Sequence, residues 1–232
     1  MDLTVVIPQR GKIELTLDCL ASMRRVESKL WPVVIVDDGS SDEERERFNY
    51  LKPKGVRFIS QPGFGVTSAW NLGALHVCTE TVLFLNNDVL FHQPAIELLL
   101  EPLRQREACL TGVRSRCESI VPKKLFPDGE AMKFLEGWAF ACRVDDYYRI
   151  GGFDEQFELY YSDTDFQLRM MEEYGTAGIR VVDDVGLEHL GHRTAHAQPV
   201  HRQLWRRDRE LFLQKWKHSR SNDDDVAVIA NL

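Results

Sequence analysis

Residues 33–42 read VVIVDDGSSD, and this stretch contains the strand, turn and helix start from which the fold is predicted. The four β-branched residues Val33–Val36 are typical of a strand that is buried on both faces, as the strands of parallel sheets are. The polar residues that follow indicate a turn, and Ser41 with Glu44 three positions later matches a helix capping box. A buried strand that leads through a short turn into a helix is the repeating unit of α/β folds.

The same unit recurs through the first half of the chain. Three more apolar runs predict strands, at Leu3–Ile7, Val56–Ile59 and Val82–Leu85, and amphipathic stretches separate them. Strands that alternate with helices predict an α/β fold with a mostly parallel central sheet flanked by helices. Ligands of such sheets bind beyond the carboxyl ends of the strands, so the polar residues at those ends are the first candidates for a site.

The second half of the chain has a less regular pattern. Residues Leu110–Glu136 show weak periodicity and are expected to form a surface excursion that covers a site. Further on we expect a strand near Trp138–Cys142, a helix from Ser162, a strand at Ile179–Val182 and a basic amphipathic helix at Arg202–Lys217. The tail 219–232 is expected to be mobile, although Val226–Ile229 could add an edge strand.

The composition argues against several functional classes. A hydrophobic fraction of 44% with 28% charged residues is ordinary for a folded protein, and the net charge of −7 argues against a nucleic-acid binder. The five cysteines include no CxxC pair, so neither a zinc site nor a disulfide framework is expected. The first residues do not resemble a signal peptide, and no apolar run approaches the roughly 20 residues that cross a bilayer. The expected location is the cytoplasm.

Two polar clusters follow predicted strands. Asp37 and Asp38 follow the second strand, where carboxylates can accept hydrogen bonds from a ribose or a pyrimidine; the alternative is turn and capping chemistry. Asn86-Asn87-Asp88 follows the fourth strand. A hard cation such as Mg²⁺ or Mn²⁺ prefers such oxygen ligands and keeps positions for substrate phosphates, whereas the alternative is a plain Asn/Asp turn.

Two more clusters lie in the second half. A capping box of Ser162 and Asp165 would explain those two residues and leave Asp163 as a candidate general base at a helix start. Asp165 is also expected to pair with Arg169 one turn later. His189 is either a structural histidine or a further ligand of a cation that Asp88 binds.

Taken together and in this order, the motifs resemble the family 2 glycosyltransferases with the GT-A fold. The resemblance extends from about Leu3 to Trp216. Its matching stretches are VVIP at 5–8, VIVDDGS at 34–40, GFG at 63–65, NLG at 71–73, LNNDV at 85–89, GGFDE at 151–155, DTD at 163–165 with Arg169, and His189 with Gly191. Asn86 stands where the family often has Asp, and this is similar to its rhamnosyltransferase-like members.

The resemblance implies an inverting enzyme that passes a hexosyl or deoxyhexosyl group from a nucleotide-diphospho-sugar to a hydroxyl of a glycan or lipid-linked acceptor, as in polysaccharide biosynthesis. It implies that the nucleotide pocket is lined by Pro8, Asp37, Asp38, Asn71 and Asn86. Asp88 and His189 would bind Mg²⁺ or Mn²⁺, and Asp163 would be the general base. One catalytic domain would span 1–218, with a nucleotide-binding half at 1–105, an acceptor half at 106–200 and the basic helix at 201–218.

The sequence departs from the family pattern at two more positions and leaves other functions open. Ser162 replaces the Glu that commonly precedes the base, and Gln9-Arg10-Gly11 lacks the usual Asn. The alternatives are a non-catalytic nucleotide-sugar-binding module and a sugar nucleotidyltransferase, although the latter should have a glycine-rich phosphate loop after the first strand. The basic helix is expected to pack on its own domain or on a second subunit of a homodimer, or else to contact an anionic membrane.

Overall fold

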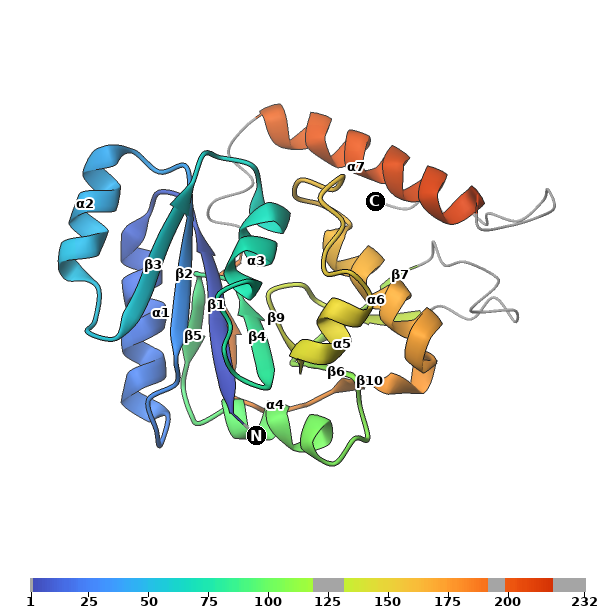
Figure 1. The fold of residues 1–232 in the computed structure, drawn as a ribbon, viewed down its shortest axis with the longest axis horizontal. Helices are drawn as coiled ribbons and strands as arrows, with labels where there is room; N and C mark the ends of the chain where they lie inside the picture. The colour runs from blue at the N-terminus through green and yellow to red at the C-terminus, as the bar shows by residue number, and fades with distance from the viewer. Residues whose placement is uncertain (1, 119–131, 192–198, 219–232) are drawn as a thin grey trace.

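A seven-stranded sheet runs through the part of the chain that this computed structural model describes, residues 2–118, 132–191 and 199–218 (Figure 1). In order across the sheet, the strands are β10 (Ile179–Val181), β6 (Leu110–Gly112), β9 (Ala139–Arg143), β4 (Thr81–Leu85), β1 (Leu3–Gln9), β2 (Val33–Asp38) and β3 (Val56–Gln61). Only β9 is antiparallel to its neighbours. The predicted mostly parallel α/β fold is therefore confirmed.

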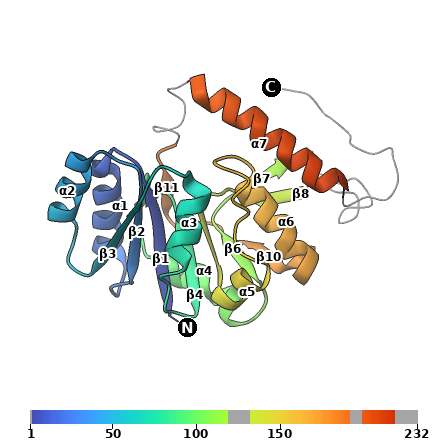
Figure 2. The same cartoon turned by 45° about the horizontal axis from the view of Figure 1, so that its top comes forward.

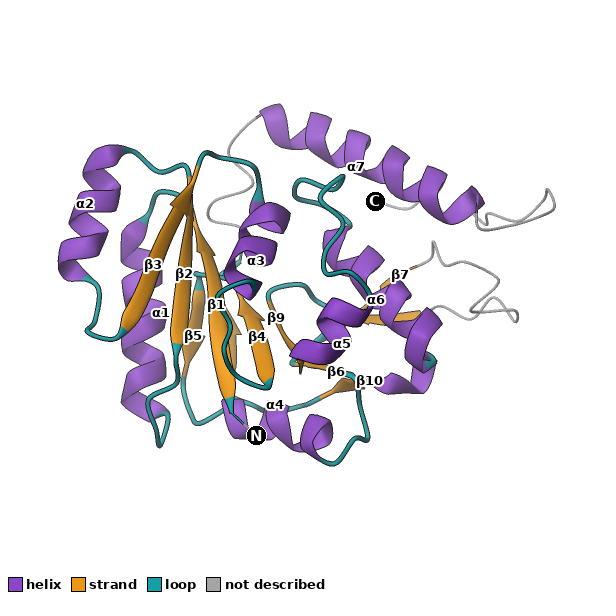
Figure 3. Cartoon of the chain, in the orientation of Figure 1, coloured by secondary structure: helices purple, strands orange, loops and turns teal. Residues whose placement is uncertain are grey.

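Helices cover both faces of the sheet (Figure 3). They are α1 (Ile13–Val26), α2 (Asp42–Leu51), α3 (Val66–Ala74), α4 (Ile96–Arg104), α5 (Val144–Arg149), α6 (Ser162–Tyr174) and α7 (Pro199–His218), with a short 3-10 helix η1 (Thr176–Gly178). Side chains alternate along a strand, so Val5 and Ile7 of β1 pack with α1 and α4 while Val6 packs with α3 and α6. All three are fully buried.

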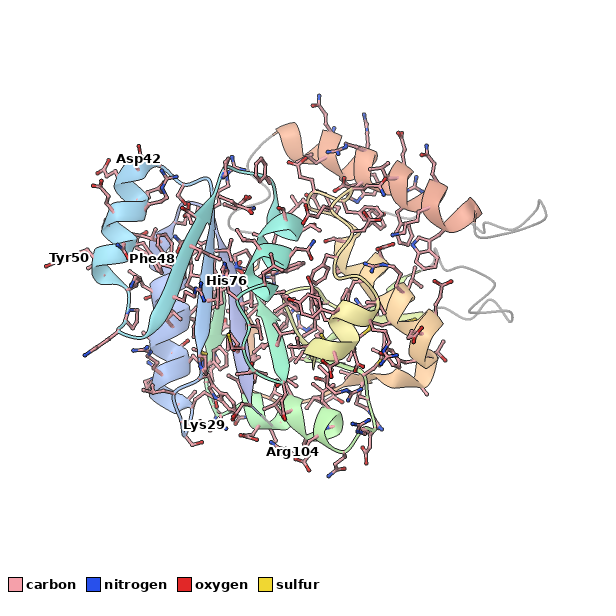
Figure 4. All side chains as sticks on the ribbon, in the orientation of Figure 1. Lys29, Asp42, Phe48, Tyr50, His76 and Arg104 are labelled. Atoms are coloured by element: carbon pink, nitrogen blue, oxygen red, sulfur yellow. The ribbon has the colours of Figure 1, made fainter. Side chains whose placement is uncertain are left out.

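The turn after β2 forms as its sequence predicts. Ser41 is the N-cap of α2, and its hydroxyl accepts a hydrogen bond from the Glu44 N–H at 3.2 Å while Glu44 Oε2 accepts one from the Ser41 N–H at 3.0 Å. Phe48 then reaches the sheet, where its ring lies 5.0 Å from that of Phe58 on β3. Tyr50 points away from the sheet and is 89% exposed (Figure 4).

Two short sheets lie beside the central one. β5 (Val89–Phe91) pairs antiparallel with β11 (Leu187–His189), and β7 (Ser115–Glu118) pairs antiparallel with β8 (Met132–Leu135). The β5–β11 pair joins the residues just after β4 to a segment about a hundred positions later in the chain.

Two expectations need correction. β2 continues through Asp38, so both aspartates belong to the strand end and do not follow it. The segment 110–136 does not begin as a surface excursion, because its first residues form β6, which is buried in the central sheet. A strand of three residues is too short for its hydrophobic periodicity to be recognised in the sequence. Residues 119–131 and the tail 219–232 are outside the described residues.

The C-terminal helix α7 packs on its own domain, over α6 and the loop before it (Figures 1 and 2). It contributes Phe212 and Trp216 to an apolar cluster with Phe134, Phe157, Leu168 and Met171. Within the described residues, no helix is both long and apolar enough to cross a membrane.

The contact between α3 and the sheet gives a test of the packing. A methyl group at Gly73 would lie 2.3 Å from Val6 Cγ1 and 3.1 Å from Val36 Cγ2. Gly73→Ala should therefore lower the free energy of unfolding by about 1–3 kcal/mol, although alanine is the better helix former. In a Val6→Ala background the same substitution should cost much less, because the clashing methyl group is gone. Urea unfolding of the four variants measures this, and equal costs in both backgrounds would contradict the contact.

Candidate active site

Asp37 lies at the carboxyl end of β2 in a polar network with the end of β1. Its side chain is fully buried. The Gln9 amide donates to Asp37 Oδ2 at 3.2 Å, the Ser40 N–H donates to Oδ1 at 3.1 Å, and the Ser40 hydroxyl also contacts Oδ2. Ser40 in turn accepts a hydrogen bond from the Gly11 N–H at 2.8 Å. The network ties together the turns that follow β1 and β2.

Asp38 has a different task from its neighbour. Its Oδ1 accepts hydrogen bonds from the Gln61 amide and the Phe64 N–H, both at 2.8 Å, and its Oδ2 accepts one from the Gly65 N–H at 3.0 Å. The carboxylate therefore holds the loop after β3 in place. Gly39 permits the close approach of that loop, since a Cβ there would lie 2.7 Å from a backbone nitrogen.

Asp88 and His189 are brought together by the β5–β11 pair. Asp88 immediately precedes β5, and His189 at the end of β11 is in register with Val89. His189 Nε2 lies 3.1 Å from Asp88 Oδ1 and 3.5 Å from the Asn86 amide nitrogen. The side chains of His189 and Asp88 are largely buried, at 14% and 6% exposure respectively. The imidazole also stacks on Trp138, with ring centroids 5.1 Å apart and planes 11° apart.

This donor set fits a hard divalent cation. A carboxylate and a neutral imidazole are both ligands of divalent cations such as Mn²⁺, and here Asp88 Oδ1 and His189 Nε2 lie 3.1 Å apart. Among the described residues no group of three His, Cys, Asp or Glu side chains could hold a metal. Two protein ligands suit Mg²⁺ or Mn²⁺ that completes its shell with phosphates and water.

Asp163 lies in the first turn of α6, at 9% exposure. The predicted capping role of Ser162 is wrong: Tyr161 is the N-cap, in the left-handed conformation at φ 63°, and no side chain caps the helix. The Asp163 carboxylate lies against Gly137, where a Cβ would be 2.5 Å from its Oδ2. Since Gly137 is followed by Trp138, which stacks on His189, one short segment connects Asp163 to the Asp88–His189 pair.

Asp165 has a structural role, and its predicted pairing with Arg169 is confirmed. Its side chain is fully buried, and Arg169 Nε donates to Oδ2 at 2.8 Å. Its other oxygen accepts from Trp216 Nε1 at 3.1 Å and pairs with Lys215 Nζ at 2.8 Å. Lys215 also reaches Asp154 at 2.6 Å. Burial opposes ionisation of the Asp154 carboxyl, but the Lys215 ammonium and the hydrogen bonds from Gln156 together lower its pKa.

Asn71 connects α3 to the turn Gly151–Glu155. Its amide donates to the Phe153 carbonyl at 2.9 Å and to Glu155 Oε1 at 2.8 Å, and its oxygen accepts from the Phe153 N–H at 3.0 Å. The amide group of Asn71 is therefore hydrogen-bonded to other parts of the protein. Pro8 lies in β1 in register with Val36, next to the Gln9–Asp37 network.

Sequence reasoning did not single out several residues that shape this site. They are Gln9, Gln61, Gly137, Trp138, Asp208, Lys215 and Trp216. In the sequence, Gln9 stood out only because it departs from a family pattern. Gly137 and Trp138 carry no motif that distinguishes them from the start of an ordinary strand. Their roles arise from contacts between segments distant in the chain, which no local pattern reports.

The known proteins that this chain resembles are glycosyltransferases. The chain matches the family described as "Glycosyl transferase family 2" over residues 4–166. It is 29% identical over 99 residues to an uncharacterized glycosyltransferase of Rickettsia felis, a match that covers 42% of this chain and 16% of that protein. It is 28% identical over 127 residues to the dolichyl-phosphate beta-glucosyltransferase of Saccharomyces cerevisiae, covering 49% of this chain and 37% of that one. The matches thus span well under half the length of these relatives.

A solved structure confirms the fold. The mannosyltransferase of Pyrobaculum calidifontis, in complex with GDP-Man and Mn²⁺, superposes with a TM-score of 0.64 at 19% identity, over 91% of this chain and 64% of that one. The fold is therefore the GT-A fold that the sequence motifs implied.

The structural role of Asp165 leads to a stability prediction. Asp165→Asn should lower the free energy of unfolding by about 2–3 kcal/mol, because the partly buried Arg169 and Lys215 lose the counter-charge of a fully buried carboxylate. Glu97→Gln is the matched control, since Glu97 pairs with Lys29 and Arg104 but is 45% exposed. It should cost less than about 1 kcal/mol. Chemical unfolding that gives both variants the same small loss would show that Asp165 is not an anchor.

Proposed function

The chain belongs to glycosyl transferase family 2, and from this membership we propose that it moves a hexosyl or deoxyhexosyl group from a nucleotide-diphospho-sugar to an acceptor hydroxyl. The transfer inverts the anomeric carbon. Asn86 in place of the more usual Asp favours the rhamnosyltransferase-like branch. The observation that carries the proposal is the approach of His189 Nε2 to within 3.1 Å of Asp88 Oδ1 at the carboxyl edge of the sheet, where α/β folds bind their ligands.

Asp88 and His189 would hold Mg²⁺ or Mn²⁺. The solved mannosyltransferase contains Mn²⁺ with its nucleotide sugar, which supports a divalent cation here. When bound, the cation supplies Lewis-acid stabilisation of the charge that develops on the departing diphosphate. Trp138 supports the ligand from the protein side, because its stacked ring limits the orientations of the His189 imidazole.

The nucleotide would bind between the ends of β1 and β2. Asp37 and Gln9 would form the polar base of this pocket. Among the described residues, the side-chain oxygen Oε1 of Gln9 has no hydrogen-bond partner. Pro8 and Asn86 flank the same edge, at the ends of β1 and β4. Asp38 shapes the pocket indirectly by holding the loop after β3. Asn71 acts in the same way through its bonds to Phe153.

Asp163 would be the general base. It accepts the proton of the acceptor hydroxyl while the new bond forms between that oxygen and the anomeric carbon, and the bond from this carbon to the diphosphate oxygen breaks. The nucleoside diphosphate leaves with the bonding electrons. Asp165 is fully occupied by Arg169, Lys215 and Trp216, so it is a poor candidate for this step. Asp163, by contrast, is next to the segment that carries Trp138.

The acceptor would be a glycan or a lipid-linked molecule, consistent with a role in polysaccharide biosynthesis at a cytoplasmic location. The packing of α7 on its own domain favours the simplest of the three expected roles for this helix. Arg206 and Trp205 remain exposed on it, the latter at 41%, so contact with an anionic membrane or with a second subunit stays part of the proposal.

The cation site generates the first functional prediction. Asp88→Ala should abolish Mn²⁺-dependent sugar transfer, and His189→Ala should weaken the affinity for Mn²⁺, because each removes one of the two protein ligands. His92→Ala is the control: His92 directly follows β5 and pairs with Glu188 of β11 at 2.7 Å, but is 55% exposed. A thermal-shift titration with UDP-, dTDP- and GDP-sugars, with and without Mn²⁺, identifies the donor before the rates are measured.

Three outcomes would contradict parts of the proposed function. Full transfer activity in excess chelator would show that no cation is needed. Donor binding without any transfer would favour a non-catalytic nucleotide-sugar-binding module, whereas release of pyrophosphate from a nucleoside triphosphate and a sugar phosphate would indicate a nucleotidyltransferase.

The second functional prediction concerns the base. Asp163→Asn should lower kcat by roughly 10²–10⁴-fold, the usual contribution of a general base, while the Kd for the donor stays near that of the wild type. Asp145→Asn is the matched control, because Asp145 also lies in the first turn of a helix but is exposed. Steady-state kinetics together with calorimetric donor binding measure both quantities. Wild-type kcat in a folded Asp163→Asn variant would show that another residue is the base.

A further inference from the structure

Asp208, in the interior of α7, holds the backbone just before α6. Its Oδ2 accepts hydrogen bonds from the N–H of Leu159 at 3.1 Å and from that of Tyr160 at 2.9 Å. The side chain is fully buried. A carboxylate that accepts two backbone N–H groups makes charge-assisted bonds, which are stronger than those between neutral groups. The last residues before the N-cap of α6 are thus held by a helix much later in the chain.

The burial of this carboxylate is costly, and the cost is not recovered by an ion pair. No Lys or Arg of the described residues pairs with Asp208, and its Oδ1 has no hydrogen-bond partner among them. Burial, and then the charge of Asp208, raise the pKa of the neighbouring Tyr160 hydroxyl. A buried, unpaired charge lowers stability, so packing alone does not account for an acid at this position.

Two more side chains of α7 contact the same segment at a regular spacing. Phe212 lies one helical turn after Asp208, and its ring centroid is 4.9 Å from that of Tyr161. Trp216 lies one turn further and donates to Asp165 Oδ1 at 3.1 Å. Residues four apart share one face of a helix. That face of α7 therefore contacts the segment 159–165 through three side chains spaced one helical turn apart.

Asp163 lies within this segment, between the residues that α7 contacts. Tyr161 has the left-handed conformation at φ 63°, which costs a non-glycine residue of order 1 kcal/mol or more and persists only where its surroundings impose it. The bonds of Asp208 to the two preceding residues and the ring of Phe212 provide those surroundings. The turn at Tyr161 sets where α6 begins, and so where the Asp163 carboxylate lies relative to Gly137.

We propose that Asp208 is a positioning residue for transfer: by fixing the Leu159 and Tyr160 backbone, it places Asp163 at the reacting centre. The proposal rests on the proposed function, in which Asp163 is the base. A displacement of a reacting group by about 1 Å can lower a rate by about 10²-fold. Loss of Asp208 should therefore lower kcat, whereas donor binding at the ends of β1, β2 and β4 should be unaffected.

The test uses two substitutions that separate position from charge. Both N–H groups bond to the same oxygen, so the carbonyl oxygen of Asp208→Asn can retain both bonds, whereas Asp208→Leu removes them but fills a similar volume. We expect Asp208→Leu to lower kcat by about 10–10²-fold with little change in donor Kd, and Asp208→Asn to stay within about threefold of wild type. Asp208→Ala replaces the leucine variant should that variant not fold.

Two controls exclude a general loss of stability. Arg207→Ala removes a contact of the same helix with the same loop, since Arg207 pairs with Glu158 at 2.9 Å, but its side chain is 54% exposed. It should leave kcat unchanged. Met171→Ala lowers stability within the cluster that α7 shares with α6, two turns beyond Asp163, and should lower the melting temperature without lowering kcat at 25 °C.

Amide hydrogen exchange gives a reading that does not depend on the reaction. Exchange at Leu159 and Tyr160 should accelerate in Asp208→Leu and remain slow in Asp208→Asn. Wild-type kcat in a folded Asp208→Leu variant, or an equal loss of kcat in Asp208→Asn and Asp208→Leu, would overturn the proposal. If the wild type transfers no sugar, the proposed function fails, and unchanged exchange in Asp208→Leu would then overturn the positioning role independently.

Discussion

The antiparallel pairing of β11 with β5 is the interaction on which the candidate site depends. Its register places His189 opposite Val89, so that the imidazole reaches the Asp88 carboxylate at 3.1 Å. Side chains alternate between the faces of a strand, and a slip of one residue would turn His189 away from Asp88. The pairing is reinforced by a backbone bond from the Leu190 N–H to the Asp88 carbonyl at 2.9 Å. A segment from the second half of the chain thereby completes a site that begins in the first.

Several buried carboxylates of this protein differ in the groups that they bond. Asp38 and Asp208 accept backbone N–H bonds from loops distant in the sequence, and Asp165 joins α6 to α7. Such bonds replace only part of the hydration that a buried charge loses. Asp163 instead lies against Gly137, and Asp88 pairs with His189, which stacks on the adjacent Trp138. These aspartates thus differ in the groups that surround them, although their side chains are chemically the same.

Much of the fold could be predicted from short segments because its signals are local. The apolar run Val33–Val36 and the capping pair Ser41–Glu44 both behave as their patterns predict, since burial of β-branched residues and helix capping involve neighbours in the chain. The prediction failed for Leu110–Gly112, whose burial depends on β9 and β10. It failed again at Ser162, since the N-cap is Tyr161, whose ring packs on Phe212 of the distant helix α7.

The sequence by itself determined the alternation of strands and helices, the polar residues at the strand ends and the pairing of Asp165 with Arg169 one turn away. These features depend on periodicity and on separations of a few residues. Only the tertiary structure decided that Asp38 holds a loop, that Asn71 supports Phe153 and that His189 meets Asp88. Each of these contacts joins residues more than twenty positions apart, and their geometry depends on how the sheet and its helices pack.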